Sequence, residues 1–471
     1  MDRRSFLHST AYASAGLIVP NFLNARGNGY PEVRTPASQR KFTSKAVEDT
    51  IARFRKYTSN TELGWLFENC FPNTLDTTVD FEVINGRPDT YVITGDIDAM
   101  WLRDSTAQVW PYLPLVKEDP KLQQLIAGVI NRQTQNILYD PYANAFYKDH
   151  TKISEWKDDV TKMKPGIHER KWEIDSLCYP IRLAYRYWKE TGDTKPFDNS
   201  WKEAVLLVLK TFKEQQRKEN KGPYHFERRT TWATDGVPLG GYGYPVKPVG
   251  LICSMFRPSD DATIFPFLIP SNFFAVKSME QAAEMLNKIY GDAASATQCS
   301  QLAQEVAAAL KKHAVINDPV HGKLYAYEVN GFGSFNLMDD ANVPSLLALP
   351  YLDAVPVSDP VYQNTRKYLL STDNPFFFKG KAAEGIGGPH AGMDMIWPLS
   401  IIIRGLTSTD KKEMAYCIQT LQKTHAGTGF MHESFHKDDP SRFTRKWFAW
   451  ANTIFGEFVL HLYHTQKALV A

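Results

Sequence analysis

Two adjacent carboxylates, Asp260 and Asp261, lie in a segment that turns strongly apolar and aromatic directly after them. A carboxyl group that faces such an apolar wall tends to have a raised pKa and can hold a proton at neutral pH. A protonated carboxyl group is what general-acid catalysis requires. The alternative is that Ser259 and Asp260 only cap a helix and interact favourably with its dipole. The recurrence of the pattern along the chain favours a role in chemistry.

Acidic residues recur at the start of apolar, helix-length segments, with more polar helical stretches between them. Six apolar helices that alternate with six amphipathic ones predict an all-α fold, an (α/α)6 barrel, whose inner-helix starts converge on one polar pit. A sixth apolar segment, residues 446–452, lacks the acid. The acidic starts are Asp96 and Asp98, Glu173 and Asp175, Asp260 and Asp261, Asp339 and Asp340, and Asp394.

Smaller elements are predicted beside these helices. Residues 44–69 carry apolar side chains at helical spacing. Residues 81–94 form two short apolar runs around Asn85-Gly86, which predicts a β-hairpin. Residues 324–331 end in Asn330-Gly331 and predict a second hairpin. Both hairpins lead into acidic segments, so we expect them on the face that carries the pit.

One polar cluster, Asp98, Trp101, Arg103 and Asp104, stands at a predicted helix start. An arginine fork and carboxylates bind sugar hydroxyls well, while an aromatic ring stacks on the sugar. The alternative is a buried Arg–Asp pair that only holds the helix in place. The residues alone leave both interpretations open.

Glu433 lies between a histidine and a serine in a loop before the sixth apolar segment. A glutamate held by hydrogen-bond donors stays ionised and can take a proton from water. His432, Glu433 and His436 also raise the question of a metal. Their H-E-x-x-x-H spacing misses the helical i,i+4 geometry of zinc proteases by one residue, so no metal site is predicted.

A glycine-rich loop over residues 384–398 contains two further polar candidates, His390 and Asp394. Both are candidates for binding substrate hydroxyls. A single histidine in such a loop is more often structural than catalytic, so this interpretation competes with a purely structural one.

Composition narrows the class of protein. The 471 residues carry a formal net charge of +2 with acids and bases mixed, which gives little support to nucleic-acid binding or to a membrane-surface protein. Aromatic residues make up 13%, which suits sugar recognition, although most will belong to the core. Five cysteines without CxxC spacing argue against a zinc site and allow at most two disulfides. No linker-like tract divides the chain, so residues 31–471 are predicted to form one catalytic domain.

The N-terminal segment has the features of an export signal. Arg3-Arg4-Ser5-Phe6-Leu7, followed by a mild apolar run, resembles a bacterial twin-arginine (Tat) signal over residues 1–30. The alternative is a short amphipathic helix. The apolar run is too short for a membrane span. We therefore predict an exported, periplasmic protein.

Four motifs resemble glycoside hydrolase family 125, the bacterial and fungal exo-α-1,6-mannosidases. They are residues 95–105 (GDIDAMWLRDS), 256–272 (FRPSDDATIFPFLIPSN), 388–398 (GPHAGMDMIWP) and 429–435 (GFMHESF). The resemblance implies an (α/α)6 barrel and cofactor-free, metal-independent hydrolysis of a terminal non-reducing α-1,6-linked mannose, with inversion. The implied partner is an α-mannoside oligosaccharide, such as one derived from an N-glycan. No oligomer is predicted.

By the same resemblance, the general acid is Asp260 or Asp261 and the general base is Glu433. Which of the two aspartates acts is left open. Two other functions remain as alternatives: another (α/α)6 carbohydrate enzyme, such as a glucosidase or a lyase, and a carbohydrate-binding toroid without turnover. The residues expected to bind the sugar are Asp98, Trp101, Arg103, Asp104, Arg257, Asn272, His390, Asp394 and His432.

Overall fold

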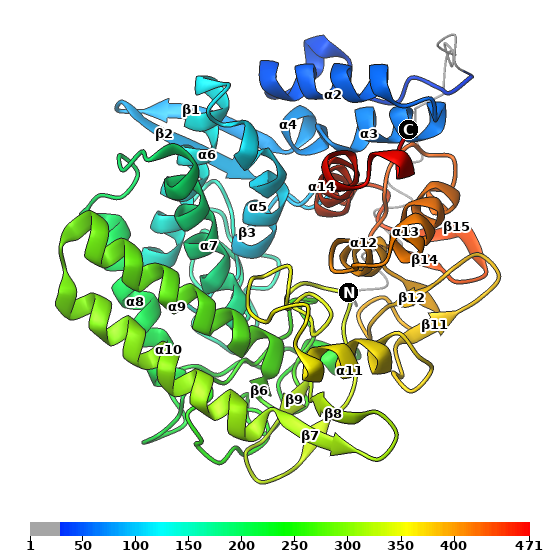
Figure 1. The fold of residues 1–471 in the computed structure, drawn as a ribbon. Helices are drawn as coiled ribbons and strands as arrows, with labels where there is room; N and C mark the ends of the chain where they lie inside the picture. Colours follow the sequence, from blue (N-terminus) through cyan, green and yellow to red (C-terminus); the bar gives the residue numbers. More distant parts are fainter. Residues whose placement is uncertain (1–28) are drawn as a thin grey trace.

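The computed structural model describes residues 29–471 and is mostly helical (Figure 1). Residues 1–28, which hold the twin-arginine motif, lie outside the described part. The helices are α2 (Lys45–Tyr57), α3 (Thr61–Cys70), α4 (Asn73–Thr77), α5 (Leu102–Val109), α6 (Pro120–Tyr139), α7 (Ile174–Thr191), α8 (Asn199–Gln215), α9 (Ile269–Tyr290), α10 (Ala293–His313), α11 (Pro360–Leu369), α12 (Pro398–Leu406), α13 (Lys411–Thr424) and α14 (Ala449–Thr465).

Short strands within residues 29–471 form six small sheets, and every strand pair is antiparallel. The sheets have the strand orders β1-β2, β3-β4-β5, β10-β9-β6, β7-β8, β11-β12 and β13-β14-β15. The strands are β1 (Val79–Ile84), β2 (Arg87–Val92), β3 (Met100–Trp101), β4 (Ala145–Phe146), β5 (Ile167–Glu169), β6 (Phe267–Leu268), β7 (Val315–Asp318), β8 (Gly322–Tyr325), β9 (Glu328–Val329), β10 (Phe335–Asn336), β11 (Phe377–Lys379), β12 (Glu384–Ile386), β13 (Met395–Ile396), β14 (Ser434–His436) and β15 (Asp439–Thr444).

The chain makes one circuit around a common centre, as the colours of Figure 1 show. Helix α5 packs against α7 and α14, α7 also packs against α9, and α14 packs against α12. The more polar helices α10, α13 and α3 pack on α9, α12 and α14, respectively. From α9 to α13, helices that pack around the centre are thus each paired with a helix that packs on them.

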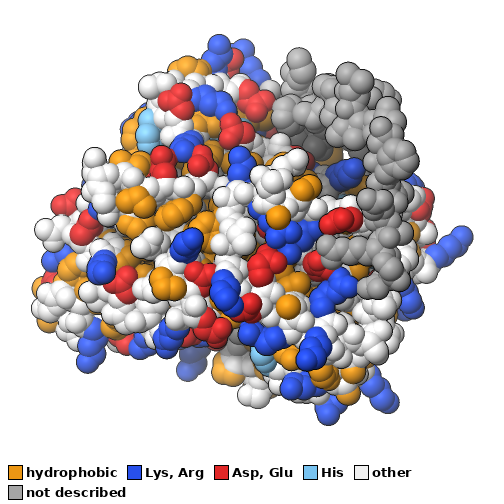
Figure 2. All heavy atoms as spheres, turned by 90° about the horizontal axis from the view of Figure 1, so that it is seen from above, with side chains coloured by type: hydrophobic (Ala, Val, Ile, Leu, Met, Phe, Trp, Pro, Cys, Tyr) orange, Lys and Arg blue, Asp and Glu red, His pale blue; other side chains and the backbone are white. Residues whose placement is uncertain are grey.

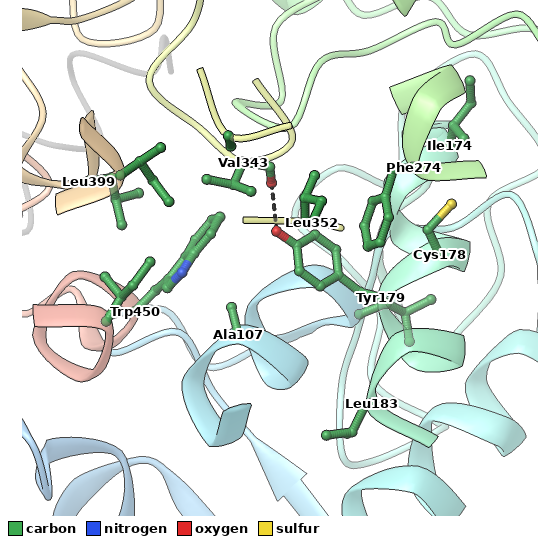
Figure 3. Packing of buried hydrophobic residues seen from close by; sticks show 14 of the residues in the cluster. Ala107, Ile174, Cys178, Tyr179, Leu183, Phe274, Val343, Leu352, Leu399 and Trp450 are labelled. Atoms are coloured by element: carbon green, nitrogen blue, oxygen red, sulfur yellow. Dashed lines mark hydrogen bonds between the residues drawn. The ribbon is translucent and has the colours of Figure 1, made fainter. Parts of the chain in front are cut away.

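Side chains from distant parts of the sequence meet in one core (Figure 3). The ring of Tyr179 on α7 contacts the edges of Phe274 on α9 and Trp450 on α14, at centroid distances of 5.1 and 6.5 Å. Its buried hydroxyl group donates to the carbonyl oxygen of Val343 at 2.8 Å. A buried phenol needs such a partner, because an unpaired polar group in the core is costly. Tyr179 thus ties three helices to the irregular segment around residue 343.

The helices differ in how their N-termini are capped. Apart from the short α4, the helices α5, α7, α9, α12 and α14 begin without a capping side chain. These are the helices that pack around the common centre. The positive end of a helix dipole favours nearby negative charge, so their N-termini suit an acidic site. The other helices are capped by Ser44, Asn60, Asp119, Asp198, Asp292, Asp359 and Asp410.

Two predicted helix starts are wrong. No helix begins at Asp260, because Asp260 has a left-handed backbone with φ +66°, and α9 begins at Ile269. No helix follows Asp340 either, since residues 341–359 form turns. Pro344, Pro350 and Pro356 interrupt this segment, and each removes a backbone donor and restricts the residue before it.

Other local predictions agree with the structure in part. The first hairpin is confirmed: β1 and β2 pair around Asn85 and Gly86, both with positive φ. The second hairpin is only partly as predicted, because residues 324–329 divide between β8 and β9 and the β9-β10 loop is longer than a two-residue turn. Residues 44–69 form two helices, with Asn60 capping the second.

The surface charges, the cysteines and the helix lengths bear on the class of protein. Acidic and basic side chains are interspersed over the face shown in Figure 2, in keeping with the small net charge. All five cysteines are buried free thiols. Among the helices of residues 29–471, none combines the length and apolar character that a membrane crossing requires.

Candidate active site

A tight turn presents Asp260 at the site. The backbone N–H of Asp260 donates to the carbonyl of Arg257 at 2.9 Å, and the N–H of Arg257 donates to the carbonyl of Asp261 at 2.7 Å. Asp260 is left-handed at φ +66°, a conformation that is uncommon for residues other than glycine. Such strain persists where the surroundings impose it and is frequent at functional sites.

The two adjacent aspartates have different surroundings. The Asp260 side chain is 13% exposed, whereas that of Asp261 is 0% exposed. Asp260 Oδ1 accepts hydrogen bonds from Arg103 Nη2 at 3.2 Å and from Asn144 Nδ2 at 3.3 Å. Asp261 Oδ1 accepts one from Thr234 at 2.8 Å. Of the pair, only Asp260 therefore reaches solvent.

Arg103 is the centre of a group of carboxyl groups that we call the Arg103 cluster: Asp104, Glu173, Asp175 and Asp260. Its guanidinium lies 2.6 Å from Glu173, 3.2 Å from Asp260, 3.3 Å from Asp104 and 3.4 Å from Asp175. Arg103 itself is buried. The sequence suggested either a sugar-binding fork or a buried Arg–Asp pair, and the contacts are those of a buried arginine that organises carboxyl groups.

The carboxyl groups of the Arg103 cluster hold protons more strongly than isolated ones. Burial raises the pKa of Asp175 to about 6 and that of Glu173 well above its usual value, while Arg103 opposes both shifts. Burial also raises the pKa of Asp104, against Arg103. One guanidinium shared among several buried acids cannot keep all of them ionised. The cluster is therefore a place where a carboxyl group can carry a proton at neutral pH.

Glu433 lies in a second group, the Arg445 cluster: Arg445, Glu433, Thr444 and Asp96. The hydroxyl group of Thr444 donates to Glu433 Oε2 at 2.9 Å, and Arg445 Nη1 lies 3.5 Å from Oε1. The β14-β15 pairing sets Ser434 opposite Thr444, which brings Glu433 and Arg445 together. This hairpin after Glu433 was not predicted. Glu433 is buried, so the contacts fix its orientation.

The two clusters are electrically connected. Arg445 is bound by Asp96, with Nε at 2.8 Å, and by the hydroxyl group of Thr94 at 3.0 Å. Arg445 also acts on Asp104 of the Arg103 cluster and lowers its pKa against the effect of burial. Asp260 and Glu433 thus belong to one network of charges that runs through Arg103, Asp104 and Arg445.

The side chains of two predicted sugar ligands are engaged in contacts within the protein. Asn272 is fully buried, and its amide bonds the backbone of Ile252 at 2.8 and 2.9 Å and that of Leu268 at 2.8 Å. His432 is buried and stacks on Phe443 at 3.7 Å, and burial lowers its pKa to about 4. Both side chains therefore support the site rather than line it.

Trp101 and Asp98 differ in their exposure to solvent. Trp101 is 5% exposed as a residue and its ring contacts that of His168 edge-on at 5.1 Å, so little of the ring is open to a sugar. Asp98 has a side chain that is 73% exposed and pairs with Lys152 at 3.0 Å. Asp98 is therefore a surface residue.

The three remaining predicted ligands differ in their contacts. Arg257 is buried and donates to Glu328 at 2.8 Å. His390 Nδ1 lies 3.7 Å from Asp261 Oδ1. Asp394 is half-exposed, has φ +67° and lies 3.8 Å from Lys437. His390 and Asp394 are thus open enough to meet a ligand, and Arg257 is held in an ion pair.

No metal site emerges from the described part of the chain. Within residues 29–471, no three or more His, Cys, Asp or Glu side chains are placed to hold an ion. His432 stacks on Phe443 instead of pointing with Glu433 at a common centre.

Several site residues were not predicted from the sequence. Glu173 was noticed only as an acidic helix start, and Asn144, Thr444 and Arg445 were not singled out at all. Glu173, Asn144 and Arg445 contribute through contacts that join segments far apart in the chain, such as the 70 positions between Arg103 and Glu173. Thr444 contributes through the β14-β15 hairpin. The acid before α7 was the available signal for Glu173, whereas a single Asn, Thr or Arg residue gave none.

Comparison with known proteins decides the family. The sequence profile of the metal-independent alpha-mannosidases (GH125) matches residues 60–460. The chain belongs to glycoside hydrolase family 125. It is therefore a metal-independent α-mannosidase, and the alternatives of a lyase, a glucosidase or a binding protein without turnover are set aside.

Relatives of this GH125 chain support the same conclusion. The meiotically up-regulated gene 157 protein of Schizosaccharomyces pombe is 41% identical over 458 residues, which cover 93% of this chain and 90% of the relative. A metal-independent α-mannosidase of Streptococcus pneumoniae, solved in a non-productive complex with α-1,6-mannobiose, is 40% identical. That structure superimposes with a TM-score of 0.87, covering 90% of this chain and 100% of the other.

A more distant structure shares the fold alone. A bacterial glucoamylase in complex with acarbose is 13% identical, with a TM-score of 0.54 over 89% of this chain and 56% of the glucoamylase. The GH125 chain thus has a mostly helical fold that resembles those of glucoamylase and of the streptococcal α-mannosidase.

Proposed function

We propose that this GH125 enzyme is an exo-acting, inverting α-mannosidase that removes terminal, non-reducing α-1,6-linked mannose, with Asp260 as general acid and Glu433 as general base. The observation that carries the proposal is that these two carboxyl groups, far apart in the chain, belong to one charge network through Arg103, Asp104 and Arg445. Each end of this network provides what one half of the reaction needs.

Asp260 is favoured over Asp261 as the acid because of its exposure. A general acid must reach the oxygen of the leaving group. The Asp260 side chain has a solvent-exposed part, and that of Asp261 has none. Asp260 also lies in the Arg103 cluster, where burial favours protonated carboxyl groups. We assign Asp261 to holding the turn, through Thr234.

Glu433 is suited to the opposite role. Thr444 and Arg445 direct donors at its two carboxylate oxygens. A carboxylate held by these donors can accept a proton from a water molecule on its open side. The glutamate is also held in one orientation, so an attacking water is aligned before the reaction begins.

The proposed reaction is a single displacement. Asp260 gives its proton to the glycosidic oxygen while the bond from this oxygen to the anomeric carbon breaks. Glu433 takes a proton from a water whose oxygen bonds to the same carbon from the opposite face. In inverting enzymes the two carboxyl groups stand roughly 6.5–9.5 Å apart, which leaves room for the water. The anomeric configuration is thereby inverted, and the product is β-mannose.

The substrate proposal follows the streptococcal relative, whose structure holds α-1,6-mannobiose. We propose an α-mannoside oligosaccharide, such as one derived from an N-glycan, as the substrate. We propose that His390 and Asp394 bind hydroxyl groups of the terminal mannose. Arg257 holds the turn, and the exposed Asp98 contacts the next sugar unit.

We further propose that residues 31–471 form one catalytic domain, built as an (α/α)6 barrel. The inner ring consists of α5, α7, α9, α12 and α14, with the irregular residues 344–358 in the sixth position. Support comes from the mutual packing of these helices and from their shared lack of capping side chains. Uncapped N-termini then face the pit, where they stabilise carboxylates.

The substrate proposal is tested with α-1,6-mannotriose that carries a fluorescent label at its reducing end. Exo-action predicts free mannose and labelled mannobiose as the first products. Labelled mannose without labelled mannobiose would contradict exo-action. A panel of α-1,2-, α-1,3- and α-1,6-mannobioses and isomaltose measures linkage and sugar preference, and faster cleavage of any member other than α-1,6-mannobiose overturns the substrate assignment. Activity should persist in excess EDTA.

We also propose export through the twin-arginine route, supported by Arg3-Arg4 and the following apolar run. This route carries folded proteins, which suits a chain whose five cysteines are buried free thiols. Fractionation of cells should place the full chain in the periplasm. Replacement of Arg3 and Arg4 by lysine should retain it in the cytoplasm, and unchanged periplasmic yield would contradict the proposal.

A further inference from the structure

Glu173 shares its hydrogen-bond donors with the proposed general acid. We propose that Glu173 is a positioning residue that forms a proton-sharing carboxyl pair with Asp260 and keeps a proton on that pair between turnovers. The inference rests on the proposed role of Asp260. It extends that role by naming the group that controls the acid.

The geometry of the pair is set by two shared donors. Arg103 donates through Nη1 to Glu173 Oε2 at 2.6 Å and through Nη2 to Asp260 Oδ1 at 3.2 Å. The amide nitrogen of Asn144 lies 3.4 Å from Glu173 Oε1 and 3.3 Å from Asp260 Oδ1. These shared donors hold the two carboxyl groups next to each other, and a proton on either one allows a direct hydrogen bond between them.

The charge balance favours one proton on the pair. Two carboxylates in contact repel each other, so the second of them to lose its proton does so only at high pH. Burial and the neighbouring Asp260 raise the pKa of Glu173 well above its usual value, although Arg103 opposes this. The proton belongs to the pair as a whole, since coupled groups titrate together.

The two members of the pair differ in solvent exposure, and therefore in their roles. The Glu173 side chain is 0% exposed, and Ser176 donates to its Oε2 at 2.9 Å. It stands at the N-cap position of α7 without capping the helix. A substrate therefore meets Asp260, and Glu173 acts through it.

Other charged groups face the pair from several elements and add to the electrostatic potential at the pair. They are Arg103 and Asp104 on α5, Asp175 on α7, and Lys171, which donates to the Asp260 carbonyl at 2.9 Å. His168 and Glu169 on β5 also interact with Asp260 electrostatically. Arg445 reaches the cluster through Asp104. Among these, Glu173 is the carboxyl group that shares both donors with Asp260.

Proton flow through the pair is balanced over one turnover. Asp260 gives one proton to the leaving oxygen, and Glu433 gains one proton from the attacking water. When Asp260 has given up its proton, two negative charges stand in contact. Their repulsion favours the uptake of a proton from solvent, while Glu433 releases one. The pair thus resets the acid after each turnover.

The test is the pH dependence of kcat/KM in the full-length enzyme, measured on α-1,6-mannobiose. Glu173→Gln keeps size and hydrogen bonding but removes the negative charge. Without it, Asp260 beside Arg103 loses its proton more easily, so the alkaline limb should move to lower pH by about one unit or more. Glu173→Asp restores the charge and should return the limb towards that of the wild type.

A second variant changes the limb in the opposite direction. Asn144→Ala removes a donor that both carboxylates share, so the pair holds its proton more strongly and the alkaline limb should move to higher pH. This variant keeps the test decisive if Glu173→Gln does not fold. Shifts of opposite sign are not expected from a purely structural role, which would lower kcat without moving the limb.

Asp175→Asn is the matched control, because Asp175 contacts the same guanidinium at 3.4 Å without sharing Asn144. Its limb should move less than that of Glu173→Gln. An unmoved limb in Glu173→Gln, or equal shifts in both variants, overturns the inference. If Asp260→Asn is inactive while the alkaline limb of Glu173→Gln stays at the wild-type pH, only the proposed proton-sharing pair is wrong. If Asp260→Asn keeps near wild-type activity, the proposed function itself is wrong.

Discussion

The Arg103 cluster and the Arg445 cluster contrast in the ratio of acids to bases. Arg103 lies within 3.4 Å of four carboxyl groups, of which three are buried and Asp260 reaches solvent. Arg445 serves two, Asp96 and Glu433, and Glu433 has the hydroxyl group of Thr444 in addition. Excess carboxyl groups favour bound protons, and ample donors favour ionised oxygens. One site thus combines a group of carboxyl groups around a single arginine with a glutamate that has two donors of its own.

The contrast also shows that an acidic residue is defined by its partners. Asp260 and Asp261 are neighbours in sequence with the same side chain, yet only one contacts Arg103. Where two environments shift the pKa values of two carboxyl groups in opposite directions, one group can act as the acid and the other as the base. The predictions below test whether the two clusters differ in this way.

The largest effect is expected at the Arg445 cluster. Glu433→Gln keeps the shape of the side chain but cannot accept a proton from water. The variant should lose roughly 10³–10⁴-fold in kcat on α-1,6-mannobiose, with an unchanged circular dichroism spectrum. A loss of less than tenfold would remove Glu433 from the role of base.

The Arg103 cluster should show a different dependence on the leaving group. Asp260→Asn should lose roughly 10²–10⁴-fold on α-1,6-mannobiose, whose leaving sugar needs a proton. On 2,4-dinitrophenyl α-mannoside, whose leaving group needs none, most of that loss should disappear. Steady-state kinetics on both substrates measure the difference.

Two variants serve as comparisons for this prediction. Glu433→Gln should be impaired on both substrates, because water must be activated in each. Asp261→Asn makes the same chemical change one residue further on, and its loss should be similar on the two substrates. If Asp261→Asn, and not Asp260→Asn, recovers on the activated substrate, the acid is Asp261.

Arg445 is expected to act through the orientation of Glu433. Arg445→Lys keeps the charge but loses the planar fork that binds Asp96 and Glu433 together. We expect kcat to fall by up to about 10²-fold with KM little changed, and Arg445→Met to be worse. Arg404→Met, which breaks ion pairs with Glu384 and Glu413, is the control and should leave kcat unchanged. Equal losses in the control would make the effect one of general stability.

The smallest effect concerns a carboxyl group in neither cluster. Burial raises the pKa of Glu457 to about 7 from 4.5, although a hydrogen bond from Tyr351 lowers it. Its protonated form favours the folded state below pH 4.5, and this contribution is lost as the pH rises through 7. Glu457→Gln should therefore gain about 2 °C in Tm relative to the wild type across this window, with unchanged kcat. A Tm difference that does not vary with pH would contradict the assignment.

Local sequence signals predicted the parts of the fold that depend on neighbouring residues. Asn85-Gly86 predicted its hairpin because both residues accept a positive φ. Long motifs identified the family, and with it the two carboxyl candidates. The acidic start at Glu173 is followed by helix α7 as predicted. The start at Asp340 failed because prolines interrupt the segment after it, as at Pro344, where turns replace the expected helix.

The contacts that distinguish the two clusters were beyond the reach of the sequence. The pairing of Arg103 with Glu173 and Asp260 joins residues 70 and 157 positions apart. Nothing local marks Arg103 as a hub, and its pattern was equally suited to binding sugar. Likewise, Asn272 and His432 were predicted to contact substrate, but tertiary packing assigns them to the backbone and to Phe443.

The most direct measurement of the central claim is ¹H NMR of the first-formed anomer during hydrolysis of α-1,6-mannobiose. A carboxyl acid and a separate carboxylate base acting on one water predict that β-mannose appears first and then mutarotates to the α form. Initial release of α-mannose would require a covalent intermediate, and it would contradict the roles given to Asp260 and Glu433.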